Sequence, residues 1–270
     1  MSGREAPIVG FLSGKGGVGK TNAATNVAVA CRGRGARVLL VDGDLGLANV
    51  DTLLGLLPSH TAVDLLEGRC KLEEAVLEGP RGVHVLPAAR GRRGLSDCRP
   101  HELAGLLLPL LEASDRYDLV LLDLGTGIGD TAVGLSACCD LAVVVTTPEL
   151  PSLVDSYAML KVLATEAPEL PVEILVNAGR NEAEARRVHE QLVQICERFL
   201  ARSPGFLDFV PIDARLAEAV RLQQAVVERF PTSRSSRGFS RIAERLLRQP
   251  RVRPPCAVPV GSELSGGAPS

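Results

Sequence analysis

The chain has no tryptophan, and aromatic residues make up only 3% of its 270 residues. Hydrophobic residues still make up 46%, which is enough for a globular protein. The core must therefore be built from Leu, Val, Ala and Ile, as in a parallel sheet covered by helices. A chain of 270 residues suits one large α/β domain.

Two further absences exclude whole classes of protein. The formal net charge is −2, so the overall charge gives no support to a nucleic-acid binder. No apolar run approaches the roughly 18 residues of a membrane-spanning helix. The start of the chain, Met1–Ala6, is too short and too polar for a signal peptide. We therefore expect a cytoplasmic protein.

The cysteines show neither C-x-x-C nor zinc-finger spacing, and there are only four histidines. The seven cysteines are Cys31, Cys70, Cys98, Cys138, Cys139, Cys196 and Cys256. An odd, scattered set predicts reduced thiols and no disulfide framework. The adjacent pair Cys138-Cys139 raises the alternative of a metal cluster. Adjacent residues inside a helix point about 100° apart, so we expect buried packing there instead.

Short apolar runs alternate with longer helical periods along the chain. Strands are expected at 8–12, 37–41, 83–87, 119–123, 141–145, 173–177 and 206–210. Helices are expected at 22–31, 49–56, 61–67, 72–77, 100–112, 152–164 and 182–200, with two more through Val220 and between Arg234 and Arg248. This order predicts an α/β fold with a mostly parallel twisted sheet flanked by helices.

Composition predicts the domain organisation. We expect one domain over residues 1–248 and a disordered tail, rich in Pro, Gly and Ser, over residues 249–270. Residues 91–98 are polar and rich in Gly and Arg, which predicts a mobile loop. In the helix over 182–200, one stripe carries Val188, Leu192, Ile195 and Phe199, and we expect this stripe to face the core.

The segment Gly14–Thr21 fits the phosphate-binding loop G-x-x-x-x-G-K-[ST], between an apolar strand and a helix. Glycines let successive N–H groups face one anion, and the helix N-terminus adds partial positive charge. Lys20 can reach the β- and γ-phosphates, and the Thr21 hydroxyl can ligate Mg²⁺. The sequence therefore predicts a site for the phosphates of a nucleotide, with Mg²⁺ as cofactor.

Three aspartates follow expected strands, where open α/β sheets bind ligands. Asp123 ends a buried run and precedes Gly125, which fits a carboxylate near Mg²⁺ and a backbone N–H near the γ-phosphate. Asp42 and Asp44 lie two apart, so in an extended segment they point the same way. One can face Mg²⁺ and the other can orient the attacking water. We expect Asp42 and Asp123 to act on the metal through water.

Each of these residues also has a purely structural alternative. The glycine-rich loop can be a hairpin, and Asp123 can be a capping aspartate. The segment Asp42-Gly43-Asp44 can be an acidic turn. Lys15 can be a solvated loop lysine.

Lys15 makes the loop resemble the deviant Walker A signature K-G-G-x-G-K-[ST] of the MinD/ParA family, within the SIMIBI group of P-loop NTPases. The resemblance implies a homodimer that sandwiches two ATP molecules. It implies that Lys15 acts on the partner's phosphates, Lys20 acts in cis and Asp44 orients water. Implied nucleotide contacts are Gly14, Lys15, Gly16, Gly17, Val18, Gly19, Lys20, Thr21, Asn22, Gly125, Asn177, Pro211, Ile212 and Asp213, the last four near adenine. A lysine supplied in trans resembles an arginine finger and makes hydrolysis conditional on dimerisation.

Within that family the chain is most similar to the FlhG/FleN type of MinD-like ATPases, which regulate flagellar number. The resemblance rests chiefly on the run Asp42–Asp51 and extends over about residues 7–247. It implies a dimer face near residues 148–155. Its implied partner is a flagellar signal-recognition-type GTPase or a flagellar switch or regulator protein. Thr126 stands where alanine is usual, and we see neither an Asp-Gln-Ala-type activating extension nor a membrane helix after the last folded one.

The last expected helix carries Arg234, Arg237, Arg241, Arg245 and Arg248 on one face. Phe239, Ile242 and Leu246 line another face. We favour a helix docked on the sheet with a solvated arginine face. The alternative is a basic amphipathic helix that makes a peripheral contact with the inner face of the membrane.

These features favour an ATP-dependent dimeric switch, a slow ATPase, that regulates flagellar number or placement. The alternative cargo is septum positioning or DNA partition. The arginines Arg180, Arg186, Arg187, Arg198 and Arg202 can supply a local basic patch for DNA, although the overall charge argues against nucleic acid. A metal-cluster carrier is disfavoured by the cysteines, and a non-hydrolysing scaffold by the complete catalytic set.

Overall fold

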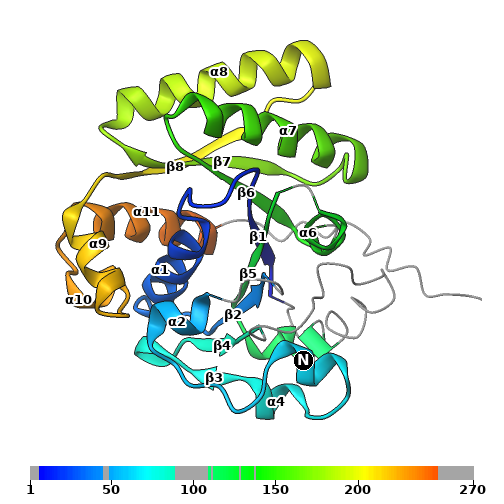
Figure 1. The fold of residues 1–270 in the computed structure, drawn as a ribbon, viewed down its shortest axis with the longest axis vertical. Helices are drawn as coiled ribbons and strands as arrows, with labels where there is room; N and C mark the ends of the chain where they lie inside the picture. The colour runs from blue at the N-terminus through cyan, green and yellow to red at the C-terminus, as the bar shows by residue number, and fades with distance from the viewer. Residues whose placement is uncertain are drawn as a thin grey trace, which may run out of the picture.

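The computed structural model describes residues 6–44, 49–88, 109–110, 112–127, 129–136 and 138–248. These residues form one eight-stranded sheet in the order β3-β4-β2-β5-β1-β6-β7-β8 (Figure 1). The strands are β1 Ile8–Ser13, β2 Val38–Gly43, β3 Leu77–Glu78, β4 His84–Leu86, β5 Leu119–Thr126, β6 Leu141–Thr146, β7 Val172–Gly179 and β8 Gly205–Pro211. Within this part of the chain, all neighbouring strands pair in parallel except β3 with β4.

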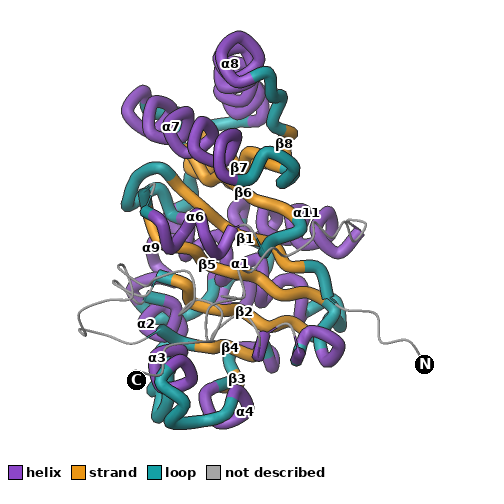
Figure 2. Tube along the Cα trace, turned by 90° about the vertical axis from the view of Figure 1, so that its right-hand side faces the viewer, coloured by secondary structure: helices purple, strands orange, loops and turns teal. Residues whose placement is uncertain are grey.

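Helices cover both faces of the sheet. They are α1 Lys20–Arg32, α2 Val50–Leu54, α3 Ala62–Leu66, α4 Leu72–Ala75, α6 Asp130–Ser136, α7 Leu150–Glu166, α8 Glu182–Leu200, α9 Ala214–Arg221, α10 Val226–Arg229 and α11 Arg234–Arg248. One core lies between the sheet and α1, α2, α10 and α11. The other lies between the sheet and α3, α4, α6, α7 and α8, and Figure 2 shows the strands stacked from β8 to β3 between these layers.

The central strands are buried on both faces, which explains their unbroken hydrophobicity. Every residue of β1, β2 and β6 is buried. Since β1 lies between β5 and β6, its carboxyl end opens at the middle of the sheet, where the following loop leads into α1. The mostly parallel α/β sheet predicted from the sequence is confirmed.

Helix α8 corrects one prediction. Val188 and Leu192 face the core as expected, but Ile195 is 40% exposed and Phe199 is 63% exposed. The buried stripe is completed by Ala185 and Cys196 instead. The two stripes share the helical period and differ in phase. Packing against α7 and the strands selects the one that continues through Cys196.

Three smaller differences concern short elements. Helix α4 ends at Ala75, and Leu77–Glu78 form the antiparallel edge strand β3, which the sequence did not predict. Helix α10 was also not predicted. Cys138 and Cys139 lie after α6 rather than inside a helix. Cys139 is fully buried, with its thiol donating to the Leu135 carbonyl, while Cys138 is half-buried.

Helix α11 is docked on the sheet, as the favoured alternative predicted. Phe239, Ile242 and Leu246 are buried in the core shared with α1. Arg241 forms a two-point ion pair with the buried carboxylate of Asp208 on β8, at 3.0 and 3.2 Å. Among the described residues, no helix is both long enough and apolar enough to cross a bilayer.

Several predictions lie outside the described residues. These are the loop at 91–98, most of the helix at 100–112 and the tail at 249–270. Part of the run Asp42–Asp51 also lies outside, since residues 45–48 are not described.

Candidate functional site

The loop between β1 and α1 has the geometry of a phosphate cradle. Gly17 and Gly19 have φ angles of 82° and 87°, a left-handed conformation that favours glycine. A Cβ atom on Gly14 would collide with the Asp155 carbonyl of α7, so this position must also be glycine. A Cβ on Gly16 or Gly17 would meet nothing within 4 Å, so the loop is open on its outer side.

Lys20 is held at the first turn of α1 by a buried ion pair. Its Nζ lies 2.7 Å from Asp123 Oδ1 on β5, and the two side chains are 3% and 0% exposed. Burial raises the pKa of the Asp123 carboxyl, and the charge and hydrogen bond of Lys20 oppose that rise. The fold therefore joins the two functional groups that the sequence assigned to the end of the loop and to the end of the run 119–123, although β5 continues past Asp123 to Thr126.

The second oxygen of Asp123 provides a test of fit for Mg²⁺. Oδ2 is buried and has no hydrogen-bond partner among the residues that the structure describes. Thr21 lies beside this carboxyl and, with Lys20, opposes the rise of its pKa that burial causes. A buried carboxylate oxygen beside a hydroxyl is a hard-oxygen donor set, which Mg²⁺ prefers. Asp123 and Thr21 therefore fit the predicted cation.

Asp42 lies beside Asp123, because these two residues are paired in the β2–β5 register. Its carboxylate accepts three backbone N–H groups, from Asp44 at 3.1 Å, Asn49 at 3.0 Å and Val50 at 3.1 Å. Burial, and next the charge of Asp123, raise the pKa of Asp42 to about 7. Asp42 thus anchors the segment that carries Asp44, in addition to the metal role that the sequence predicts for it.

Lys15 and Asp44 lie at the open side of the same site. The Lys15 side chain is exposed at the outer edge of the loop, five residues before the buried Lys20. The negative charge of Asp44 contributes to the raised pKa of Asp123, so these carboxylates are neighbours. Gly125 lies after Asp123 with open space around its Cα, and Gly127 N–H donates to the Ser13 carbonyl at 3.0 Å.

The residues predicted near adenine make protein contacts. Asn177 Nδ2 donates to the Val18 carbonyl at 2.7 Å, so this side chain lies on the phosphate loop. Ile212 is 58% exposed, and its N–H donates to the Gly179 carbonyl. Asp213 Oδ1 accepts the Arg215 N–H, and Oδ2 accepts the N–H and hydroxyl of Ser235. One carboxylate therefore caps the N-termini of both α9 and α11.

Asp213→Ala should destabilise the protein by about 2 kcal/mol, because two helix caps are lost at about 1 kcal/mol each. Burial opposes ionisation of Asp213, but the hydrogen bonds from Ser235 and Arg215 outweigh it and hold its pKa below the usual value. The stabilisation should therefore be complete above pH about 4 and disappear as the pH falls further. Urea unfolding of wild type, Asp213→Ala and Asp213→Asn measures this. The asparagine variant has one acceptor oxygen in place of two, so it should keep one cap and be intermediate in stability, and equal stability of all three would refute the double cap.

Sequence reasoning missed the contact between the loop and α7. Gly14 packs on the backbone of Asp155 and Ser156, and no short-range pattern links segments so far apart. Ser152, which is 2% exposed, fixes the start of α7: its hydroxyl accepts the Thr147 N–H and shares a hydrogen bond with the Thr146 hydroxyl. The first turns of α7 therefore support the loop and carry exposed Leu150 and Val154 beside it.

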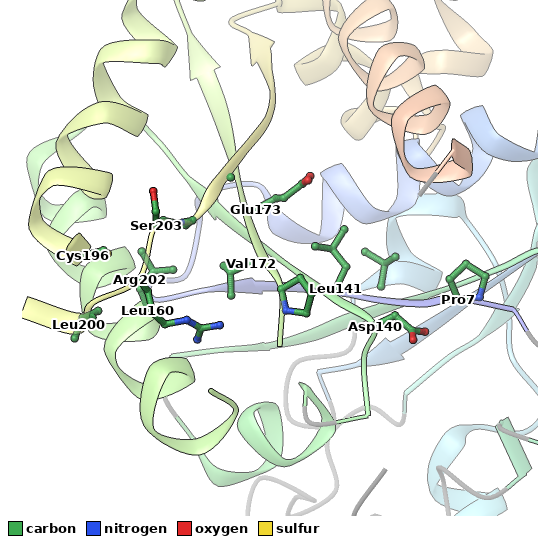
Figure 3. Close-up of a pocket in the computed structure, with 14 residues that line it drawn as sticks. Pro7, Asp140, Leu141, Leu160, Val172, Glu173, Cys196, Leu200, Arg202 and Ser203 are labelled. Carbon is green, nitrogen blue, oxygen red and sulfur yellow. The ribbon is translucent and has the colours of Figure 1, made fainter. Parts of the chain in front are cut away.

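A cavity of about 360 Å³ lies elsewhere, at the amino ends of β1, β6, β7 and β8 (Figure 3). Asp140 and Pro7 line one end, and Cys196 and Leu200 of α8 line the other. Arg202, which also lines it, donates to the carbonyl of Leu163 in α7 and to that of Leu170 after this helix. None of the predicted nucleotide-binding residues lines this cavity.

A P-loop with a second lysine, at the carboxyl edge of a parallel sheet and facing buried aspartates, defines a nucleotide-binding protein of the MinD/ParA class. The chain belongs to the family of the CobQ/CobB/MinD/ParA nucleotide binding domain, which it matches over residues 9–226.

Within this family, the chain is similar to flagellar and cell-division proteins. The chain is 37% identical to the antiactivator FleN of Pseudomonas aeruginosa over 239 residues, 88% of this chain and 85% of FleN. It is 28% identical to the flagellum site-determining protein YlxH of Helicobacter pylori, over 89% of this chain and 81% of YlxH. It resembles the crystal structure of the cell division ATPase MinD of Pyrococcus furiosus with a TM-score of 0.75 and 27% identity, over 88% of this chain and 97% of MinD.

Other solved structures agree with the assignment. MinD of Pyrococcus horikoshii, in complex with Mg-ADP, matches with a TM-score of 0.74 and 28% identity, over 89% of this chain and 96% of that protein. Mg-ADP is thus a ligand of that relative. The chain is a MinD/ParA-type ATPase by family and fold.

Proposed function

We propose that this chain is an ATP-dependent dimeric switch, a slow ATPase, that regulates flagellar number or placement. The observation that best supports the proposed switch is the different burial of the two lysines of the loop. Lys20 is buried on Asp123, whereas Lys15 is exposed at the outer edge of the loop. A side chain exposed at that edge is free to neutralise phosphate charge in a second copy, in the manner of an arginine finger.

Each residue of the nucleotide site has a distinct proposed role. Loop N–H groups and Lys20 bind the phosphates, and Asp44 orients the attacking water. Thr21, with Asp42 and Asp123 acting through water, would hold Mg²⁺, which would neutralise phosphate charge. Asn22, Gly125 and the segment from Pro211 to Asp213 complete the proposed nucleotide contacts. Leu150 and Val154 lie beside the loop and extend the proposed dimer face with apolar surface.

The flagellar role is supported by similarity to FleN and YlxH. The partner is then a flagellar signal-recognition-type GTPase or a flagellar switch or regulator protein. Deleting the gene in its own host should change the number or position of flagella per cell without moving division septa. A chromosomal Lys20→Ala allele should reproduce the deletion, since the switch needs its nucleotide. Electron microscopy and septum staining measure both; normal flagella with misplaced septa would contradict the flagellar role.

Normal flagella with misplaced septa would favour the second candidate function, septum positioning. This candidate is supported by similarity to the septum site-determining protein MinD of Bacillus subtilis, with 30% identity over 88% of this chain and 87% of MinD. DNA partition has less support. Arg180 and Arg186 pair with glutamates of α8, and Arg202 holds the carbonyls of α7. The five arginines thus do not form one free basic patch.

We further propose that any membrane contact is peripheral, at the inner face, and rests on arginines. The apolar side chains of α11 are buried and are therefore not available for insertion into a bilayer. Arg241 and Arg245 are engaged with Asp208, while Arg234 and Arg237 are exposed. Such a contact would be weak in a monomer and stronger when a dimer doubles it.

A further inference from the structure

Asn177 contacts the phosphate loop from β7, which lies two strands away from β1 in the sheet. Its Nδ2 donates to the Val18 carbonyl at 2.7 Å, across 159 residues of sequence. The same amide group lies so close to Gly19 that a Cβ atom there would collide with Nδ2. A carbonyl oxygen can accept a hydrogen bond but not donate one, so the contact also fixes which end of the Asn177 amide faces the loop.

The backbone of β7 is shaped to make this contact. Side chains alternate along a strand, so Asn177 lies on the same face as Leu175, which belongs to the core on the α1 side. The next residue, Ala178, has a φ angle of 56°, which residues with a side chain rarely adopt. The β7–β8 register shifts between Asn177 and Gly179. This bulge interrupts regular pairing directly after Asn177, and pairing resumes between Gly179 and Pro211.

The geometry of the peptide unit gives the contact a consequence for phosphate binding. The Val18 carbonyl and the Gly19 N–H belong to one planar trans peptide, so they point in opposite directions. Holding the Val18 carbonyl against Asn177 therefore aims the Gly19 N–H away from Asn177, into the concave side of the loop. Gly19, with a φ of 87°, has the conformational freedom to let this peptide flip if the hold is lost.

We propose that Asn177 is a positioning residue that clamps the phosphate loop and keeps the Gly19 N–H aimed at phosphate, whatever base the nucleotide carries. This proposal rests on the proposed function, because it concerns the same nucleotide site. It differs from a contact with adenine, which would act on the base alone. The two roles predict different ligands to be affected by the same substitution.

Asn177→Asp tests the clamp with a side chain of the same shape. The substitution replaces the donating NH₂ with an oxygen, which repels the Val18 carbonyl. Isothermal titration of wild type and variant uses two ligands in the presence of Mg²⁺: ATP and inorganic tripolyphosphate, which has no base. A clamp predicts that both affinities fall by the same factor, at least about 10-fold. A fall for ATP with unchanged tripolyphosphate binding would overturn the proposal in favour of a base contact.

The matched control is Asn181→Asp, the same chemical change four residues further along. Asn181 caps α8 by accepting the Glu184 N–H, and aspartate serves equally well as a cap. This variant should bind both ligands as wild type does. Equal weakening in the control would mean that added negative charge, rather than loss of the clamp, causes the effect.

Hydrogen exchange of the protein without nucleotide tests the clamp independently of the proposed function. In Asn177→Asp, exchange should quicken in the peptide that contains Val18 and Gly19, and remain unchanged in the peptides of β1 and α8. Unchanged exchange in the loop would overturn the clamp. If wild type bound neither ligand, the proposed function would fail, while this exchange measurement would still decide the clamp.

Discussion

Lys20→Ala abolishes nucleotide binding: we expect the affinity for Mg-ATP to fall at least about 100-fold. A hydrogen bond to a charged group contributes up to about 3 kcal/mol, and each 1.4 kcal/mol corresponds to a factor of ten. Lys20 is buried at the first turn of α1, and its ion pair with Asp123 already fixes the direction of its side chain. Isothermal titration of wild type and variant with Mg-ATP measures the loss.

The same substitution removes the cation that faces buried Asp123. Breaking a buried ion pair by deleting one partner costs about 3–5 kcal/mol, so Lys20→Ala should also be less stable. The double variant Lys20→Ala/Asp123→Asn removes the stranded charge and should recover stability without recovering binding. Urea unfolding and titration of both variants separate the effects. Binding of ATP with wild-type affinity by either folded variant would show that Lys20 has no phosphate role.

Asp44→Ala should leave ATP bound, slow its hydrolysis by about 10²–10⁴-fold and trap the dimer. The proposed role of Asp44 is to orient the attacking water, and positioned acid–base groups contribute factors of this size. ATP binding itself depends on the loop and Lys20, which the substitution does not touch. Phosphate release measures the rate, and light scattering during gel filtration with ATP measures the mass.

Asp115→Ala is the matched control. Asp115 is an exposed aspartate that precedes β5, so it lies at the amino edge of the sheet, whereas the loop lies at the carboxyl edge. It should hydrolyse ATP and change mass as wild type does. Asp44→Ala that binds ATP yet elutes as a monomer would contradict the two-copy site. Unchanged hydrolysis in Asp44→Ala would remove this residue from the mechanism.

The sequence predicted the sheet well because each central strand is buried on both faces and so leaves a continuous apolar run. The run at 119–123 ends in Asp123, and the loop at Gly14–Thr21 carries Lys20 near its end. Parallel strands bring such ends to one edge, so their meeting follows from the fold class. The 2.7 Å ion pair between them is the outcome.

Periodicity predicted that α8 is amphipathic but gave the wrong phase at one end. Ile195 and Phe199 repeat at helical spacing just as Cys196 does, so the pattern alone permits either stripe. Which stripe is buried depends on the helix and strands that pack against each turn of α8, and the local sequence does not carry this information. The same reason explains β3, whose two residues are too few for a strand pattern and are held by pairing with β4.

The partners of Asn177 and Asp213 could not be predicted either. Asn177 lies near the carboxyl end of β7 and Asp213 follows β8, so their edge of the sheet was foreseeable. Asn177 reaches Val18, and Asp213 reaches Ser235 on another helix. Hydrogen bonds between segments so distant in sequence exist only when the sheet order and the β7 bulge are in place. Neither residue type nor spacing carries that information.

The dependence of ATP hydrolysis on protein concentration tests the central claim most directly. A site completed by Lys15 of a second copy predicts that the rate per chain rises with concentration and then reaches a plateau as dimers form. Lys15→Ala should remain at the low basal rate over the same range, although Lys20 still binds ATP. A rate per chain that is constant with concentration, and equal in wild type and Lys15→Ala, would contradict the two-copy switch.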